Sequence, residues 1–165
     1  MGKSWVRDKA LLFHGDVRGM KDEWSAGRKR YKENYDKAES YYKKSIDLDN
    51  KIPEPHNNLG NLYRELGKTQ EARSCYQKAI QINSDYVEAH NNLGNLYREL
   101  GEYQKAINCY QKAIQINPNL SEVHNNLGYA YQELGKTQEA MNCYQKAIQI
   151  NSDYVEAHNN LGHLY

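Results

Sequence analysis

The stretch His90-Asn91-Asn92-Leu93-Gly94 decides the fold, because the chain repeats it at a constant spacing. The same five residues stand at 56–60, 124–128 and 158–162, so each copy follows the last by 34 residues. Tyrosines, glycines and alanines beyond the motif keep this step: Tyr63, Tyr97, Tyr131 and Tyr165; Gly67, Gly101 and Gly135; Ala72, Ala106 and Ala140. A fixed period of this length predicts a stack of similar supersecondary units.

Each period contains two helical patterns. Leu59, Leu62, Tyr63 and Leu66 form an i, i+3, i+4, i+7 stripe that ends at Gly67, and a second apolar stripe runs over 72–80. We therefore expect helical pairs at 54–66/70–82, 88–100/104–116 and 122–134/138–150. The repeated small residues predict that helix backbones approach closely at those places. Three pairs have capping-box spacing at the start of the first helices: Asp85 and Glu88, Asn119 and Glu122, Asp153 and Glu156.

At these positions the chain resembles the tetratricopeptide repeat family. Residues 87–120 carry the family's pattern in full: Leu93, Gly94, Tyr97, Ala106, Tyr110, Ala113 and Pro118. The departures are a histidine where the family has a tryptophan, and serine at 84 and 152 where it has the terminal proline. The resemblance covers residues 53–165. It implies an all-α fold, a right-handed α-solenoid of helix–turn–helix repeats.

The periodicity also predicts the domain organisation. Residues 53–86, 87–120 and 121–154 are expected to be complete repeats, 19–52 a degenerate repeat, and 1–18 an N-terminal flank or cap. Residues 155–165 read as the truncated first helix of a further repeat. That helix would expose Leu161, Leu164 and Tyr165, which predicts a fragment of a longer protein and weak end-to-end self-association.

Composition and motifs exclude several classes of function. The net charge of +1 is too small for a dedicated nucleic-acid binder, and no apolar run approaches the length of a membrane span. With no secretory signal, we expect a soluble cytoplasmic protein whose three cysteines are small buried side chains. Histidines one repeat apart are too distant to share a metal ion. Since no phosphate loop or nucleophile motif is present, we expect no catalytic residue, cofactor or small-molecule substrate.

The outer side of the first helices is the candidate site. In the family these helices line the concave groove, so the resemblance places there a set of polar residues, expected to face outward: Asn57, Asn58, Asn61, Arg64, Asn91, Asn92, Asn95, Arg98, Asn125, Asn126 and Tyr129. An asparagine amide both donates and accepts hydrogen bonds, so the ladder Asn58, Asn92, Asn126 and Asn160 could hold the backbone of an extended peptide. Arg64 and Arg98 would contact its acidic groups. The competing interpretation is that these are solvated residues copied by duplication.

Two subfamilies offer partners for comparison. In the chaperone-adaptor group a clamp of basic residues and asparagines holds an acidic tail. Asn61 and Asn92 match its asparagines, but its basic positions are Asn57, Glu122 and Asn126 here, which argues against that partner. The asparagine ladder is more similar to the repeat region of O-GlcNAc transferases.

We therefore expect a protein-interaction scaffold. The alternative is the substrate-selecting region of a larger glycosyltransferase whose catalytic domain is not in this chain. RNA binding is a weaker idea, supported only by the basic residues 28–32.

Overall fold

The computed structural model describes residues 17–165, with side chains from residue 32 onward, and every regular element in this range is a helix. The chain divides into two units, residues 1–38 and 39–165. The helices, in order, are α2 (Val17–Leu48), α3 (Pro53–Glu65), α4 (Thr69–Ile82), α5 (Val87–Glu99), α6 (Tyr103–Ile116), α7 (Ser121–Glu133), α8 (Thr137–Ile150) and α9 (Val155–Gly162). The all-α prediction is confirmed, and the three predicted helical pairs agree with α3/α4, α5/α6 and α7/α8 to within a residue.

Helix α2 differs from the expected degenerate repeat. A degenerate helix–turn–helix repeat over residues 19–52 would contain two helices. The structure instead has one uninterrupted helix over Val17–Leu48. The physical reason lies at residue 33. The turn inside each complete repeat needs a glycine, and the residue 34 positions before Gly67 is Glu33, which has no preference for the left-handed conformation that the turn requires. The helix therefore continues. Of the expected flank over residues 1–18, residues 1–16 lie outside the described residues, and the last two belong to α2.

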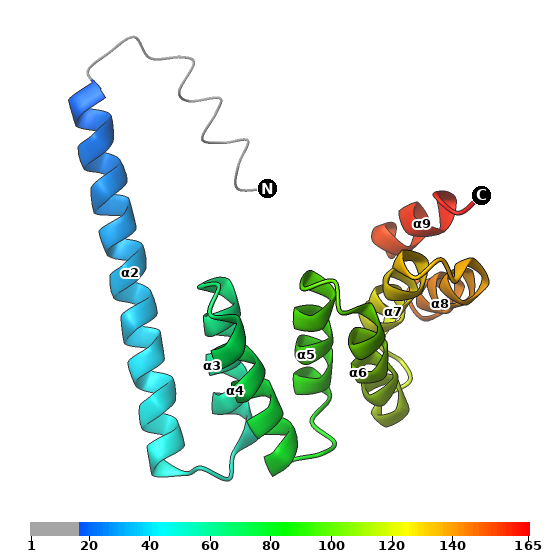
Figure 1. Ribbon diagram of the computed structural model, residues 1–165, viewed down its shortest axis with the longest axis horizontal. Coiled ribbons are helices and arrows are strands. Elements are labelled where there is room, and N and C mark those ends of the chain that lie inside the picture. Colours follow the sequence, from blue (N-terminus) through cyan, green and yellow to red (C-terminus); the bar gives the residue numbers. More distant parts are fainter. Residues whose placement is uncertain (1–16) are drawn as a thin grey trace. The chain divides into compact units, whose positions relative to one another are not determined.

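Within residues 39–165 the helices stack in the order of the sequence (Figure 1). Each of α3 to α9 packs against the next, and the first helices of successive repeats also contact one another, α3 with α5, α5 with α7 and α7 with α9. The backbones of the second helices α4, α6 and α8 do not come into contact. Since the first helices are closer together than the second helices, the stack curves toward the first-helix side. This is the α-solenoid that the period predicts.

The turn inside each repeat depends on a glycine with positive φ. Gly67, Gly101 and Gly135 have φ of 72°, 73° and 71°. In the first repeat, the Gly67 amide donates to the carbonyl of Arg64, and the Lys68 amide donates to the carbonyl of Tyr63 at 2.8 Å. This pattern is a Schellman motif, which satisfies the last carbonyls of the helix. The predicted helix stop is thus confirmed.

Replacing Gly101 by alanine is expected to lower the free energy of unfolding by about 1 kcal/mol, because alanine is strained at this φ although its Cβ would have open space. Urea denaturation followed by circular dichroism would measure the loss. Gly101→Asn is the matched control, since asparagine tolerates the left-handed region and should lose less. Equal stability of both variants and the parent would show that the turn does not need a glycine.

The turn between repeats is built differently from the prediction. The first helices begin after Tyr86, Leu120 and Tyr154, and none has a side-chain cap. The expected capping boxes are therefore absent, because an asparagine ending the preceding helix forms the turn instead. Asn83, for example, accepts a hydrogen bond from the backbone amide of Asp85 at 3.0 Å, and Asn117 and Asn151 do the same in later turns.

The repeated histidine stabilises the same turn with a side-chain hydrogen bond. His90 Nε2 lies 2.8 Å from the carbonyl oxygen of Ser84, and His124 and His158 make the same contact with the carbonyls of residues 118 and 152. A carbonyl only accepts hydrogen bonds, so Nε2 must carry the proton. His56 has no such partner for its buried Nε2 among the described residues, and burial, with the charge of Lys78, lowers its pKa. His90, His124 and His158 are therefore structural.

The core of each repeat is a tyrosine ring facing a glycine. Tyr76, Tyr110 and Tyr144 have no exposed surface, and neither do the alanines Ala72, Ala106 and Ala140. A Cβ built at Gly94 would lie 2.6 Å from the Tyr110 ring, and Gly60 and Gly128 face their own tyrosines in the same way. The glycines were expected to admit a neighbouring backbone. They admit a tyrosine side chain from the second helix instead.

The last helix, α9, packs on α8 and α7. Leu161 and Leu164 are half-buried there, contrary to the expectation that both are exposed, and Tyr165 is 85% exposed. End-to-end self-association stays a prediction. None of the described helices is long and apolar enough to cross a membrane.

Candidate interaction face

The predicted site residues all lie on α3, α5 and α7, but their exposure is uneven. We call their common side the first-helix face. Asn57, Asn125 and Asn126 are buried, with 4%, 7% and 7% of their surface exposed, so the expectation that they face outward is wrong. Asn58 is exposed. The remaining residues are half-buried: Asn61, Arg64, Asn91, Asn92, Asn95, Arg98 and Tyr129.

Two of these asparagines hold the buried tyrosines in place. Tyr76 donates from its hydroxyl to Asn61 Oδ1 at 2.8 Å, and Tyr110 donates to Asn95 Oδ1 at 2.7 Å. Burial raises the pKa of Tyr76 to about 12 and also raises the pKa of Tyr110, so both hydroxyls stay protonated donors at neutral pH. A buried hydroxyl without an acceptor would be costly, which explains an amide at this position.

In the third repeat, two residue differences together supply an acceptor for the buried tyrosine hydroxyl. Tyr129 stands where the earlier repeats have Asn61 and Asn95, so Tyr144 has no asparagine to bind. Its hydroxyl donates instead to Gln132 Oε1 at 2.9 Å. Gln132 occupies the position of Arg64 and Arg98, one helical turn further along. The change at 129 and the change at 132 together keep the buried hydroxyl satisfied.

The asparagine ladder joins neighbouring repeats. Asn92 Nδ2 donates to Asn57 Oδ1 at 2.9 Å, and Asn160 Nδ2 donates to Asn125 Oδ1 at 2.9 Å. Each bond runs from one first helix back to the previous one. The ladder therefore contributes to stacking, a role that the sequence analysis did not foresee. Asn58, the first member, makes no bond of this kind among the described residues.

The middle rung of the ladder departs from this pattern. The regular partner of Asn126 would be Asn91, yet Asn126 Nδ2 donates to Asn95 Oδ1 at 3.2 Å. Its Oδ1 accepts a hydrogen bond from Arg98 Nη1 at 3.2 Å, and the Arg98 guanidinium lies 5.7 Å from the centroid of the Tyr129 ring. As a result, the buried Oδ1 of Asn91 has no donor in the described part of the chain.

Arg98 brings a positive charge to this rung. Its contacts are an amide oxygen and the face of an aromatic ring, both neutral. The ion pairs of the described residues involve Glu39 and Glu102, with Lys43, Lys68, Arg73 and Lys105, and none includes Arg98. The guanidinium is thus oriented by its neighbours while its charge is not neutralised, an arrangement that suits a carboxylate from outside.

The cysteines offer no nucleophile. Cys75, Cys109 and Cys143 are half-buried rather than buried as expected, and burial raises the pKa of each thiol to about 11. Such thiols stay protonated at neutral pH and react slowly. Among the residues with described side chains, no three His, Cys, Asp or Glu residues gather as metal ligands.

Comparison with protein families identifies the repeat. Models of the TPR repeat match residues 60–97, 94–135 and 133–165. Two further tetratricopeptide repeat models match residues 41–74 and 29–52, so the matches extend into α2. The chain belongs to the tetratricopeptide repeat family. Arrays of this family are typically non-catalytic scaffolds. No curated protein sequence matches this tetratricopeptide array significantly.

Solved structures share the fold of the array. Two crystal structures of MamA resemble it with TM-scores of 0.74 and 0.73 and identities of 27% and 29%; they cover 93% and 84% of this chain and 85% and 76% of their own. YrrB, described as a TPR protein with an unusual peptide-binding site, has a TM-score of 0.69 at 24% identity, covering 74% of this chain and 63% of YrrB.

The first TPR of Spaghetti (RPAP3), solved with an HSP90 peptide, has a TM-score of 0.67 at 24% identity, covering 70% and 92%. At 24% identity, the last two likenesses show the fold alone. None of these structures is described as a glycosyltransferase, so the likeness to O-GlcNAc transferases has no support here.

Proposed function

We propose that the tetratricopeptide array is an interaction scaffold that binds an extended peptide along its first-helix face, at the rung formed by Asn91, Asn126 and Arg98. The fold supplies the general function, a rigid stack of helices that presents one continuous face to a partner. The position of the peptide on that face is inferred from this chain's own residues.

The observation that carries the proposal is the unpaired oxygen of Asn91. A buried polar atom without a partner costs roughly 1–3 kcal/mol, so native structures contain few of them, and each calls for an explanation. An extended peptide presents backbone N–H groups along its length. One such group would satisfy Asn91 Oδ1 once the half-buried side chain turns to present this oxygen to the peptide. The neighbouring Arg98 would then bind an acidic side chain or a chain terminus of the same peptide.

Asn91→Ala is expected to weaken peptide binding about tenfold without lowering stability. One lost hydrogen bond corresponds to roughly 1 kcal/mol in binding, and more when its partner stays buried. In the free protein, the same substitution removes an unsatisfied acceptor, so the free energy of unfolding should be unchanged or higher. The binding probe is a peptide selected from a phage-displayed library on the parent protein, with its affinity measured by calorimetry and stability by urea denaturation.

Two variants complete the design. Asn58→Ala tests the ladder without breaking a hydrogen bond between repeats. Alanine at Asn92 or Asn126 would remove a ladder residue and such a hydrogen bond at the same time. Gln70→Ala, which removes an amide side chain from the exposed surface of α4, is the matched control and should leave the affinity unchanged. Unchanged affinity of the Asn91 variant, or a loss caused by the Gln70 variant alone, would place the peptide elsewhere and contradict the proposal.

The glycosyltransferase interpretation rests on the same ladder. It requires Asn58, Asn92, Asn126 and Asn160 to be available to a substrate peptide. In the free array, Asn92 and Asn160 each use an amide hydrogen to bind the previous repeat, and Asn126 uses both its amide and its oxygen. The second N–H of each amide remains for a ligand. Substrate selection for a catalytic domain thus stays an alternative. The Asn58→Ala variant tests it as well, because this alternative requires Asn58 to bind the substrate peptide.

A further inference from the structure

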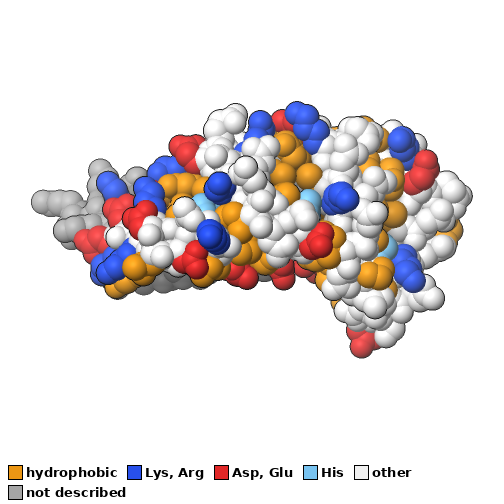
Figure 2. All heavy atoms as spheres, turned by 90° about the horizontal axis from the view of Figure 1, so that it is seen from below, with side chains coloured by type: hydrophobic (Ala, Val, Ile, Leu, Met, Phe, Trp, Pro, Cys, Tyr) orange, Lys and Arg blue, Asp and Glu red, His pale blue; other side chains and the backbone are white. Residues whose placement is uncertain are grey.

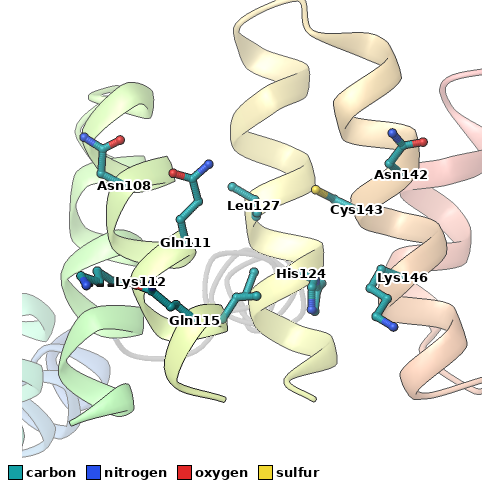
Figure 3. A pocket seen from close by; sticks show the side chains of 10 residues that line it. Asn108, Gln111, Lys112, Gln115, His124, Leu127, Asn142, Cys143 and Lys146 are labelled. Atoms are coloured by element: carbon teal, nitrogen blue, oxygen red, sulfur yellow. Dashed lines mark hydrogen bonds between the residues drawn. The ribbon is translucent and has the colours of Figure 1, made fainter. Parts of the chain in front are cut away.

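A cleft of about 730 Å³ opens on the side of the second helices. It lies between α6 and α8, and α7 forms its floor (Figure 3). The backbones of α6 and α8 do not contact each other, so the space between them is covered only by side chains. A volume of this size accommodates a small ligand or a few side chains of a partner. The peptide site proposed above is on the first helices, and this cleft is a separate surface.

The cleft has an apolar floor and a polar, positively charged rim. Leu127, Ile114 and Cys143 provide apolar surface at the floor. Lys112 from α6 and Lys146 from α8 are also among the lining residues. His124 and four amide side chains complete the lining, the amides being Asn108, Gln111, Gln115 and Asn142. No carboxylate is among the lining residues.

Neither lysine of the cleft takes part in an ion pair of the described residues. Lys112 Nζ donates to Gln115 Oε1 at 3.0 Å, and Lys146 Nζ makes the same bond to Gln149 at 3.0 Å. These partners are neutral. The turn leading from α6 to α7 has Asn119 where the other turns between repeats have Asp85 and Asp153, so this turn has one negative charge fewer. Opposite charge on a partner is therefore favoured.

The same surface recurs along the array. The heptapeptide Gln-Lys-Ala-Ile-Gln-Ile-Asn occurs without change at 77–83, 111–117 and 145–151, so a lysine stands at 78, 112 and 146. The cleft residues have identical equivalents one repeat earlier, except that Ser74 replaces Asn108. On the face shown in Figure 2, pale-blue histidines recur among orange apolar side chains, each beside a blue Lys or Arg. A row of cations at a constant step suits a chain-like anion.

We propose that this cleft binds an acidic segment of a partner protein. The segment places one apolar side chain on Leu127 and Ile114, and its flanking carboxylates contact Lys112 and Lys146. The lining favours a polypeptide over a nucleic acid, because it has aliphatic surface for an apolar side chain but no Phe, Tyr, Trp or Arg on which a base would stack. An acidic segment bound here leaves the first-helix face free for its own peptide, so one array can join two proteins.

A fluorescein-labelled octapeptide of alternating leucine and glutamate tests the proposal by fluorescence anisotropy with the full chain. The paired variant Lys112→Gln and Lys146→Gln is expected to weaken its binding about tenfold. The matched control, Lys44→Gln with Lys136→Gln, removes the same charge from exposed positions outside the cleft and should leave the affinity unchanged. Asn91→Ala should also leave it unchanged, which separates a failure here from a failure of the first-helix site.

Three results would overturn the proposal. Absence of peptide binding at millimolar protein concentration would show that the cleft does not take an acidic segment. Equal weakening by both lysine pairs would show binding to overall charge. Tighter binding of a single-stranded RNA decamer that depends on the same two cleft lysines would identify a nucleic acid as the occupant. An octapeptide of alternating leucine and lysine should not bind.

Discussion

Replacing Tyr110 by alanine is expected to lower the free energy of unfolding by about 3–5 kcal/mol, the range for removing a large aromatic side chain from a packed interior. The ring has no exposed surface and belongs to the apolar cluster shared by α6 and α7, with Ala106, Ile107 and Leu127 among its members. Its loss leaves a cavity between the two helices of the middle repeat. Because each repeat is stabilised mainly by its neighbours, a defect in the middle should weaken the stacking on both sides.

Urea denaturation monitored by circular dichroism would measure this loss. Tyr110→Phe is the matched control: it keeps the ring and removes only the hydroxyl that donates to Asn95 Oδ1, so it should cost about 1 kcal/mol. If the alanine variant unfolded at the same urea concentration as the phenylalanine variant, the ring would not be the centre of the repeat.

Replacing Gly94 by alanine is expected to destabilise the array, against the usual preference of helices for alanine. In an open helix the change would gain about 1 kcal/mol. Here the new Cβ would lie 2.6 Å from the Tyr110 ring, which is fully buried and anchored through its hydroxyl, so it cannot move aside. Overpacking of this kind costs roughly 1–3 kcal/mol and more when the neighbour is fixed. The net effect should be a clear loss of stability.

Gly162 offers the control for this prediction. It occupies the same place in α9, but nothing lies within 4 Å of a Cβ built there. Gly162→Ala should therefore leave stability unchanged or raise it slightly. A double-mutant cycle adds a second check, since Gly94→Ala should cost little once Tyr110 is already alanine. Similar effects of alanine at 94 and 162 would mean that the glycine is not required by the tyrosine.

Much of the fold follows from the sequence because the relevant interactions are local or repeat at a fixed step. The stripe of Leu59, Leu62 and Tyr63 predicts a helix, and Gly67 predicts its end; both are confirmed. Helix α2 shows the limit of extending the period by analogy. The weak similarity of residues 19–52 to a repeat concealed the missing glycine at 33, and without that glycine no turn forms.

The candidate site was only partly predictable. The sequence places Asn92 and Asn126 on first helices, and the structure has them on α5 and α7, but Asn126 is buried instead of facing outward as expected. It does not reveal their partners, because every asparagine of the ladder has several equivalent amides within reach. At the middle rung, the partners of Asn126 depend on Tyr129, which stands where the earlier repeats have an asparagine. Arg98 lies over the Tyr129 ring and binds Asn126, which donates to Asn95 instead of Asn91.

The sequence by itself determined that this protein is a stack of helical pairs, where each pair begins and ends, and which helices form the candidate face. These properties depend on residue spacing along one chain, and a spacing can be read directly. The tertiary structure alone decided that a tyrosine ring faces Gly60, Gly94 and Gly128, and that asparagines bind across repeats. It also decided that Asn91 Oδ1 has no donor among the described residues, and that lysines of two different helices border one cleft. These depend on distances between helices, and side chains of the same type make different contacts according to which neighbour comes within hydrogen-bonding or van der Waals range.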